Sequence, residues 1–288
     1  MSVSMLRSSL SFLFWLTIVL ALGIGGLLAY IYSGVYDVSA IKQHTPLTYW
    51  VLSTARRQSI KAHTTGESPL DLADADVRAR GLLLFDRHCR QCHGAPGVAP
   101  DAIGLGMNPS PPNFAQMGRD LPASEIYWAV SNGIKLTGMP AWEFRLNESE
   151  RWAIVAFLKS SPTLAPAEYK DRRTRLLSTT LNETTPHSPD AFWKPEDATR
   201  RGQVAVQQYA CPTCHVIPGI RGPDAQVGPP LEGIATRIYL AGVLLNTPAN
   251  MIEWVRNPQA IKPLSAMPNL GVTERDARDI AAYLYTLR

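Results

Sequence analysis

Cysteine and charge are both scarce in this sequence. Only four of the 288 residues are cysteine, so the chain is not a disulfide-rich scaffold. Charged residues make up 18% of the chain, and the net charge is +4. An excess this small does not indicate a nucleic-acid-binding protein and allows at most mild attraction of an acidic partner. The length suffices for two modest domains or one large one.

No charged residue occurs between Ser8 and Tyr36. Residues 11–32 within this stretch are almost wholly apolar, and as a helix they would be about 33 Å long, enough to cross a hydrocarbon core of about 30 Å. The alternative is a cleaved signal peptide, whose apolar region is normally only about 7–15 residues long. We therefore predict an uncleaved membrane anchor over residues 11–32, preceded by a short N-terminus over residues 1–10.

The rest of the chain divides into a connector, two domains and a linker. The connector, residues 33–70, contains a predicted amphipathic helix over residues 46–63, and three roles are open for that helix: packing on a domain, resting on the membrane surface or meeting a partner. The predicted domains span residues 71–166 and 196–288. Residues 167–195 between them are polar, with a basic cluster and scattered Pro, Ser and Thr, and this composition predicts an extended tether.

The two predicted domains follow one plan. Each contains, in order, a helix, a Cys-x-x-Cys-His motif, a loop rich in Pro and Gly, a helix with a tryptophan, a Met-Pro pair and a final helix. Two such orders in series indicate a duplication. Because every predicted element is helical, we expect an all-α fold: an N-terminal transmembrane helix followed by two tandem helical domains.

All four cysteines belong to the two motifs, at Cys89, Cys92 and His93 and at Cys211, Cys214 and His215. Cys-x-x-Cys-His is the attachment signature of a c-type haem. Two thiols three positions apart can bond the two vinyl groups of one porphyrin, and the adjacent His can ligate its iron. A thioredoxin-like pair needs no such His, and a structural zinc site needs four ligands. The sequence therefore predicts two covalently attached c-type haems.

A methionine is the expected sixth ligand of each iron, because a His–Met pair raises the reduction potential and leaves no open position for oxygen chemistry. The candidates are Met107, Met117 and Met139 in the first domain and Met251 and Met267 in the second. We predict Met139 and Met267, since each precedes a proline and lies just ahead of the last helix. Met107 is the alternative in the first domain.

Prolines after each motif are expected to orient the ligating histidine, whose other ring N–H needs an acceptor. A Pro-Pro turn offers a carbonyl without a competing N–H donor. We assign this role to Pro229 and to Pro111, although the choice between Pro111 and its neighbour is open by one residue. Candidates for bonding the haem propionates are Trp128 in the first domain and Arg237, Tyr239 and Trp254 in the second, with packing as the ordinary alternative for the aromatic residues.

With these motifs in place, both halves resemble class I cytochrome c domains, over residues 76–160 and 196–288. The resemblance implies that the first and last helices of each domain cross near the haem edge. The predicted contacts place Gly81 and Phe85 against Ala156 and Phe157, and Gly202 and Val206 against Ala282 and Tyr283. An anchor followed by two such domains is also similar to the di-haem subunit of cb-type terminal oxidases, although residues 33–75 carry nothing specific to that subunit.

The resemblance implies one-electron transfer, with no catalytic residue and no small-molecule substrate. The expected partners are redox proteins: a quinol-oxidising complex, a terminal oxidase or a dehydrogenase. It also implies a bacterial plasma membrane, with the haem domains in the periplasm and residues 1–10 in the cytoplasm. Two alternatives stay open: a di-haem peroxidase, which needs an iron able to bind peroxide, and a fixed subunit of a larger complex instead of a stand-alone carrier.

Overall fold

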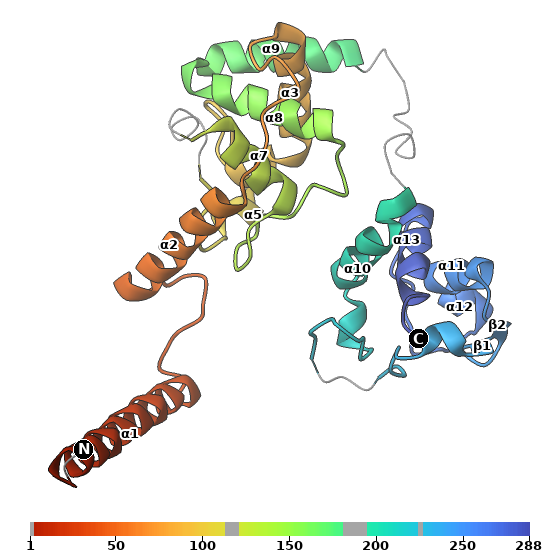
Figure 1. Ribbon diagram of the computed structural model, residues 1–288. Helices are drawn as coiled ribbons and strands as arrows, with labels where there is room; N and C mark the ends of the chain where they lie inside the picture. The colour runs from red at the N-terminus through yellow and green to blue at the C-terminus, as the bar shows by residue number, and fades with distance from the viewer. Residues whose placement is uncertain (1–2, 113–120, 181–194, 224–226) are drawn as a thin grey trace. The chain divides into compact units, whose positions relative to one another are not determined.

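Figure 1 shows the computed structural model, which describes residues 3–112, 121–180, 195–223 and 227–288. The described chain is predominantly helical, as predicted, with one two-stranded antiparallel sheet. It divides into two compact units, Met1–Glu183 and Thr184–Arg288.

Helix α1 spans Val3–Tyr32 and includes an apolar window, Leu10–Tyr32, with a mean hydropathy of 2.4. None of this window is buried against the rest of the chain. By length and composition the helix could cross a membrane, a property that membrane anchors share with signal sequences.

Helix α2 spans Pro46–His63, the range predicted from the sequence. It begins there because the Thr45 side chain accepts a hydrogen bond from the Thr48 N–H, and because Pro46 suits the first helical position. The last residue of α2 lies beside the first helical domain, since the rings of His63 and Trp128 are 6.1 Å apart.

The first domain is built on two crossing helices. Its elements are α3 (Ala75–His88), α4 (Arg90–His93), α5 (Ala102–Leu105), α7 (Ala123–Asn132), α8 (Glu148–Ser160), the short 3-10 helix η1 (Ser161–Thr163) and α9 (Pro166–Thr180). At the crossing of α3 and α8, a Cβ on Gly81 would lie 1.9 Å from the Ala153 carbonyl oxygen. The rings of Phe85 and Phe157 pack beside it, 5.1 Å apart. Glycine at this position therefore lets the two backbones touch.

The expectation of an extended tether after residue 166 is wrong for the first part of the linker, which forms α9. Tyr169 on α9 is buried and donates a hydrogen bond from its hydroxyl to Asp86 of α3, at 3.1 Å. Arg173 also donates to Asp86, at 2.7 Å. The basic cluster favours a helix because Arg172 and Arg175 pair with acidic residues one turn earlier, at 2.6 and 2.7 Å. The rest of the predicted linker, residues 181–194, lies outside the described residues.

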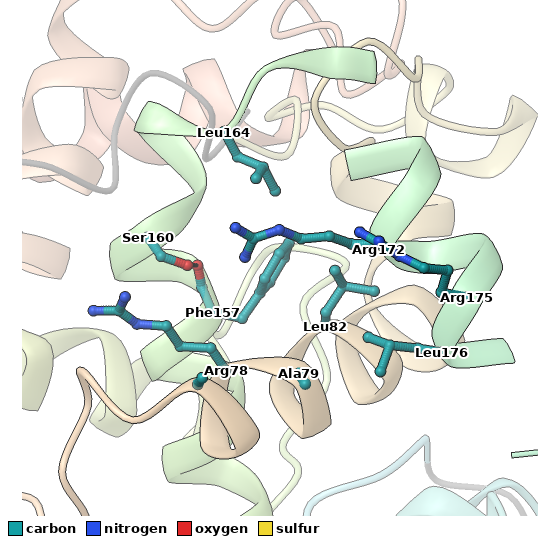
Figure 2. Close-up of a pocket in the computed structure, with 10 residues that line it drawn as sticks. Arg78, Ala79, Leu82, Phe157, Ser160, Leu164, Arg172, Arg175 and Leu176 are labelled. Carbon is teal, nitrogen blue, oxygen red and sulfur yellow. Dashed lines mark hydrogen bonds between the residues drawn. The ribbon is translucent and has the colours of Figure 1, made fainter. Parts of the chain in front are cut away.

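Helix α9 lies along the crossing of α3 and α8. A small groove of about 190 Å³ separates α9 from these two helices. Figure 2 shows Arg172 passing over Leu82 and Phe157, with Arg78 and Arg175 at two edges of the groove. Leu82 and Phe157 are each only 2% exposed. The groove is therefore a seam of helix packing, and none of the predicted haem-binding residues lines it.

The second domain repeats the crossing and buries the ion pair across it, whereas the pair across the first crossing, Arg80 with Glu150 at 3.3 Å, is partly exposed. Its elements are η3 (Pro195–Asp197), α10 (Ala198–Gln208), η4 (Cys211–Thr213), η5 (Ile234–Thr236), β1 (Tyr239–Leu240), β2 (Leu244–Leu245), α11 (Pro248–Arg256), α12 (Pro258–Ile261) and α13 (Glu274–Leu284). A Cβ on Gly202 would lie 1.9 Å from the Asp279 carbonyl oxygen. The Asp279 side chain accepts two hydrogen bonds from Arg201, at 2.7 and 2.8 Å, and this ion pair is buried.

Both predicted helix crossings are present, with one correction. The glycines approach Phe157 and Tyr283 as expected. Their nearest neighbours, however, are Ala153 and Asp279, one turn before the predicted alanines. Each glycine sits over two positions four residues apart, because residues with this spacing share a helix face.

Candidate functional site

The two Cys-x-x-Cys-His motifs adopt the same turn. In the first, the His93 N–H donates to the Cys89 carbonyl at 3.0 Å, and in the second the His215 N–H donates to the Cys211 carbonyl at 3.1 Å. In the first domain the turn follows directly from α3, since the Cys89 N–H still bonds the Phe85 carbonyl, whereas in the second Tyr209 and Ala210 separate it from α10. A single helical turn therefore carries both thiols and the histidine of each motif.

The first cysteine of each motif is a free, partly buried thiol. Burial raises the pKa of Cys89 to about 12 and that of Cys211 to about 11. All four cysteines are free, and a thiol with so high a pKa is a poor nucleophile at neutral pH. Among the described residues no cluster of three or more His, Cys, Asp or Glu side chains could hold a metal ion. The thioredoxin-like and zinc interpretations therefore gain no support.

Each motif histidine bonds a proline carbonyl through Nδ1. His215 Nδ1 lies 2.8 Å from the Pro229 oxygen, the predicted partner. His93 Nδ1 lies 2.9 Å from the oxygen of Pro112, so the choice of Pro111 was wrong by one residue. Burial lowers the pKa of His93, which favours the neutral ring that ligates metals.

The choice of Pro111 was wrong because the Pro-Pro pairs of the two domains do not occupy equivalent positions. Relative to the carbonyl that bonds the histidine, the pair in the first domain begins one residue earlier. The bonding carbonyl belongs to the first proline of its pair in the second domain and to the second proline in the first domain. Gly228, just before Pro229, faces the histidine so closely that a Cβ there would lie 2.3 Å from the His215 ring. Pro111 holds the corresponding position in the first domain. Matching the Pro-Pro pairs by eye therefore gives the wrong register.

The two Met-Pro segments share a feature that sequence reasoning missed. The Met139 N–H donates to the hydroxyl of Thr137 at 3.1 Å, and the Met267 N–H donates to the hydroxyl of Ser265 at 3.3 Å. Hydroxyl residues two positions before a backbone N–H form compact local turns of this kind. The signal was visible in the sequence as Thr-Gly-Met-Pro and Ser-Ala-Met-Pro. Each predicted ligand thus lies in a short turn held by such a hydrogen bond. We call these two segments, Thr137–Pro140 and Ser265–Pro268, the straps.

The other methionine candidates differ in position. Met251 is 2% exposed in the core of the second domain, which is the setting of a packing residue. Met107 lies against the first strap, since a Cβ on Gly138 would be 2.7 Å from its sulfur. Met107 and Met139 are therefore neighbours. Met117 lies outside the described residues.

Large exposed apolar side chains follow each motif along the sequence in the described part of the two domains. They are Val98, Ile103, Leu105 and Leu136 in the first, and Val216, Val227, Ile238, Tyr239, Val243, Leu245, Leu264 and Leu270 in the second. All but Leu270 fall between the motif histidine and the Met-Pro methionine, and Leu270 follows directly. Exposed apolar groups in such numbers indicate a binding surface. A porphyrin, which is large and apolar, fits this segment.

The predicted propionate residues are placed as follows. Arg237 donates to the Pro230 and Glu232 carbonyls, so its guanidinium braces the loop that carries Pro229. Tyr239 lies exposed on β1, and Trp254 is half-buried against the core of the second domain. Trp128 is half-buried on α7. Contact of any of these side chains with a propionate stays a prediction.

Residues 76–158 of the first unit match the family model described as cytochrome c oxidase, cbb3-type, subunit III. A cytochrome c domain of this kind implies a covalently bound c-type haem. The chain is also 29% identical over 94 residues to cytochrome c oxidase subunit 2 of Alkalihalophilus pseudofirmus. That match covers 32% of this chain and 27% of the relative. These comparisons support a cytochrome c with a part in electron transfer.

A solved structure from the reducing HAO-like protein complex of Kuenenia stuttgartiensis also matches. The match covers 72% of this chain and 95% of that chain, at 17% sequence identity and a TM-score of 0.25. A similarity at this level carries no argument about fold or function.

Proposed function

We propose that this protein is a membrane-anchored di-haem cytochrome c that transfers single electrons at the periplasmic face of a bacterial plasma membrane. One observation carries the proposal: the second domain repeats the motif turn, the histidine–proline hydrogen bond and the hydroxyl-braced methionine of the first domain. The family model covers only residues 76–158, so the second haem rests on this internal likeness.

In this proposal the cysteines of each motif hold one haem through two thioether bonds, and the motif histidine and the strap methionine bind its iron. When bound, the haem would supply an iron that takes one electron from a redox partner and passes it to another, without any bond to a substrate. The proline carbonyl fixes the histidine ring by accepting a hydrogen bond from its Nδ1–H, which also makes Nε2 a better ligand. The apolar side chains between His and Met exclude water, and a dry site with His–Met ligation favours a raised reduction potential.

A filled sixth position also separates this proposal from the peroxidase alternative. Peroxide chemistry needs an iron with an exchangeable site, whereas both domains place a braced methionine in the expected strap. The comparisons give the peroxidase alternative no support. Purified protein should therefore show no catalytic peroxide-dependent oxidation of a reduced donor.

The proposed partners are redox proteins of a respiratory complex, because the matched family and relative are both named as oxidase subunits. Helix α1 would tether the protein to the membrane that holds such a complex. Purification from native membranes in mild detergent tests whether the chain is a fixed subunit. Recovery without a stoichiometric partner would favour a stand-alone carrier.

Haem counting tests the proposal directly. The full chain, produced with the haem-attachment machinery, is expected to carry two haems by intact mass and by its absorbance as the pyridine complex. The double change Cys89→Ser with Cys92→Ser should remove one haem, and Cys211→Ser with Cys214→Ser should remove the other. A wild-type chain with a single haem, unaffected by changes in the second motif, would overturn the di-haem assignment and leave only the first domain as a cytochrome.

A further inference from the structure

The first two turns of α2 expose apolar side chains on every side. Leu47, Tyr49, Trp50, Val51 and Leu52 are each between 38% and 70% exposed. Five apolar residues within six positions surround the whole helix, because successive side chains are about 100° apart. A helix that packed one face on a domain would need only a stripe. The start of α2 is therefore suited to surroundings that are apolar on all sides.

Ring contacts hold the start of α2 near the end of α1. Tyr30, in the last turns of α1, lies 6.4 Å from the ring of Tyr36. Tyr36 in turn stacks on His44 at 6.4 Å, and its hydroxyl lies 2.6 Å from His44 Nδ1. His44 stands just before Thr45, the residue that caps α2. A chain of ring contacts thus links the last turns of α1 to the residue that precedes the cap of α2.

The rest of α2 carries positive charge alone. Arg56, Arg57 and Lys61 are all exposed, and no acidic residue occurs between Asp37 and Glu67. Phosphates of membrane lipids attract basic residues close to the surface. Tyrosine and tryptophan, here Tyr49 and Trp50, prefer the boundary between lipid and water. An apolar, aromatic end followed by a basic half is therefore complementary to a lipid surface.

We propose that Pro46–Leu52, the first two turns of α2, lie at the boundary between the headgroups and the acyl chains of the membrane that α1 crosses, with the basic half of α2 at the lipid phosphates. The inference rests on the membrane anchoring in the proposed function. The other end of α2 lies beside the first domain through His63, and the Asn108 side chain of that domain donates to the Lys42 carbonyl at 2.7 Å. The membrane contact thus fixes the height of the first haem domain above the bilayer.

Site-directed nitroxide labelling of the full chain tests this placement. All native cysteines lie in the two motifs and form thioethers in the haem-loaded protein, so one added cysteine is the only free thiol. Val51→Cys and, independently, Leu47→Cys report on the apolar turns. Gln58→Cys is the matched control, because it is exposed and lies seven residues after Val51 on the same helix face. The labelled protein is reconstituted in vesicles of phosphatidylethanolamine and phosphatidylglycerol.

The measurement is the collision rate of each label with oxygen, which enriches in lipid, relative to a water-soluble nickel chelate. We expect this ratio to be several-fold higher at positions 47 and 51 than at position 58. Equal ratios, all typical of water, would overturn the proposal. Protection of position 51 in native membranes but not in pure lipid would also overturn it, because a protein partner would then cover these turns.

Two controls separate this inference from the proposed function. The intact mass shows whether α1 is retained, and the absorbance spectrum shows whether the haems are attached. A chain that lost α1 would contradict the membrane anchor. That shorter chain, carrying the same labels and mixed with the vesicles, would still decide whether α2 enters lipid. Water-like ratios there would overturn the inference as well.

Discussion

The change Gly81→Ala tests the helix crossing of the first domain. The added Cβ would meet the Ala153 carbonyl oxygen at 1.9 Å and the carbonyl carbon at 2.6 Å. Ordinary contacts of a Cβ lie at 3.4 Å or more, so α3 and α8 must separate by more than an ångström. The obstacle is backbone, which has no rotamer to change. Overpacking costs about 1–3 kcal/mol, and we take the upper end, about 3 kcal/mol.

Alanine also favours the helix by about 1 kcal/mol relative to glycine, which leaves a net loss of about 2 kcal/mol in the free energy of unfolding. That loss is about a 30-fold change in the folding equilibrium. Guanidinium unfolding of the full chain in detergent, followed by circular dichroism, measures it. Gly106→Ala is the control, because the nearest atom to its Cβ would lie at 3.4 Å. If the two variants were equally stable, the backbones of α3 and α8 would not be in direct contact at Gly81.

Three further changes test other parts of the chain. Asp279→Asn removes the buried ion pair with Arg201 and should lower the free energy of unfolding of the second domain by about 3 kcal/mol, measured by the same unfolding assay. Met139→His should lower the reduction potential of one haem in a redox titration. Met107→Leu should leave the sulfur ligand of that haem in place and its potential unchanged. If Met107→Leu changed the potential and Met139→His did not, Met107 would be the ligand. Tyr169→Phe deletes the hydroxyl that α9 donates to α3 and should cost about 1 kcal/mol, and an unchanged stability would mean that this hydrogen bond contributes nothing net.

Local signals were sufficient where one short segment determines the structure. The bounds of α2 follow from Thr45 and Pro46, because a capping hydroxyl and a proline at the first helical position start a helix at a defined residue. The motif turns follow from the Cys-x-x-Cys-His spacing alone. The hydroxyl before each strap methionine was equally local, and only a comparison of the two Met-Pro segments was needed to find it.

Features that depend on distant parts of the chain could not be predicted in the same way. Helix α9 was interpreted as a tether from its composition, yet its stability comes from Asp86 on α3, which binds Tyr169 and Arg173 from more than eighty positions away. The register error at Pro112 has a similar cause. The length of the loop decides which carbonyl reaches the histidine, and that length is meaningful only once the folded positions of both ends are known.

The pattern of agreement between the two domains bears on the second haem. They agree in the motif turn, the histidine–proline hydrogen bond and the braced methionine. They differ in the ion pair across the crossing, which joins Arg80 and Glu150 at a partly exposed position in the first domain and is buried between Arg201 and Asp279 in the second. The differences thus fall on helix packing, which many residue pairs can provide. The agreements fall on groups that would hold an iron porphyrin. Because a fold needs none of these groups for stability alone, their retention in both domains favours the same cofactor in each.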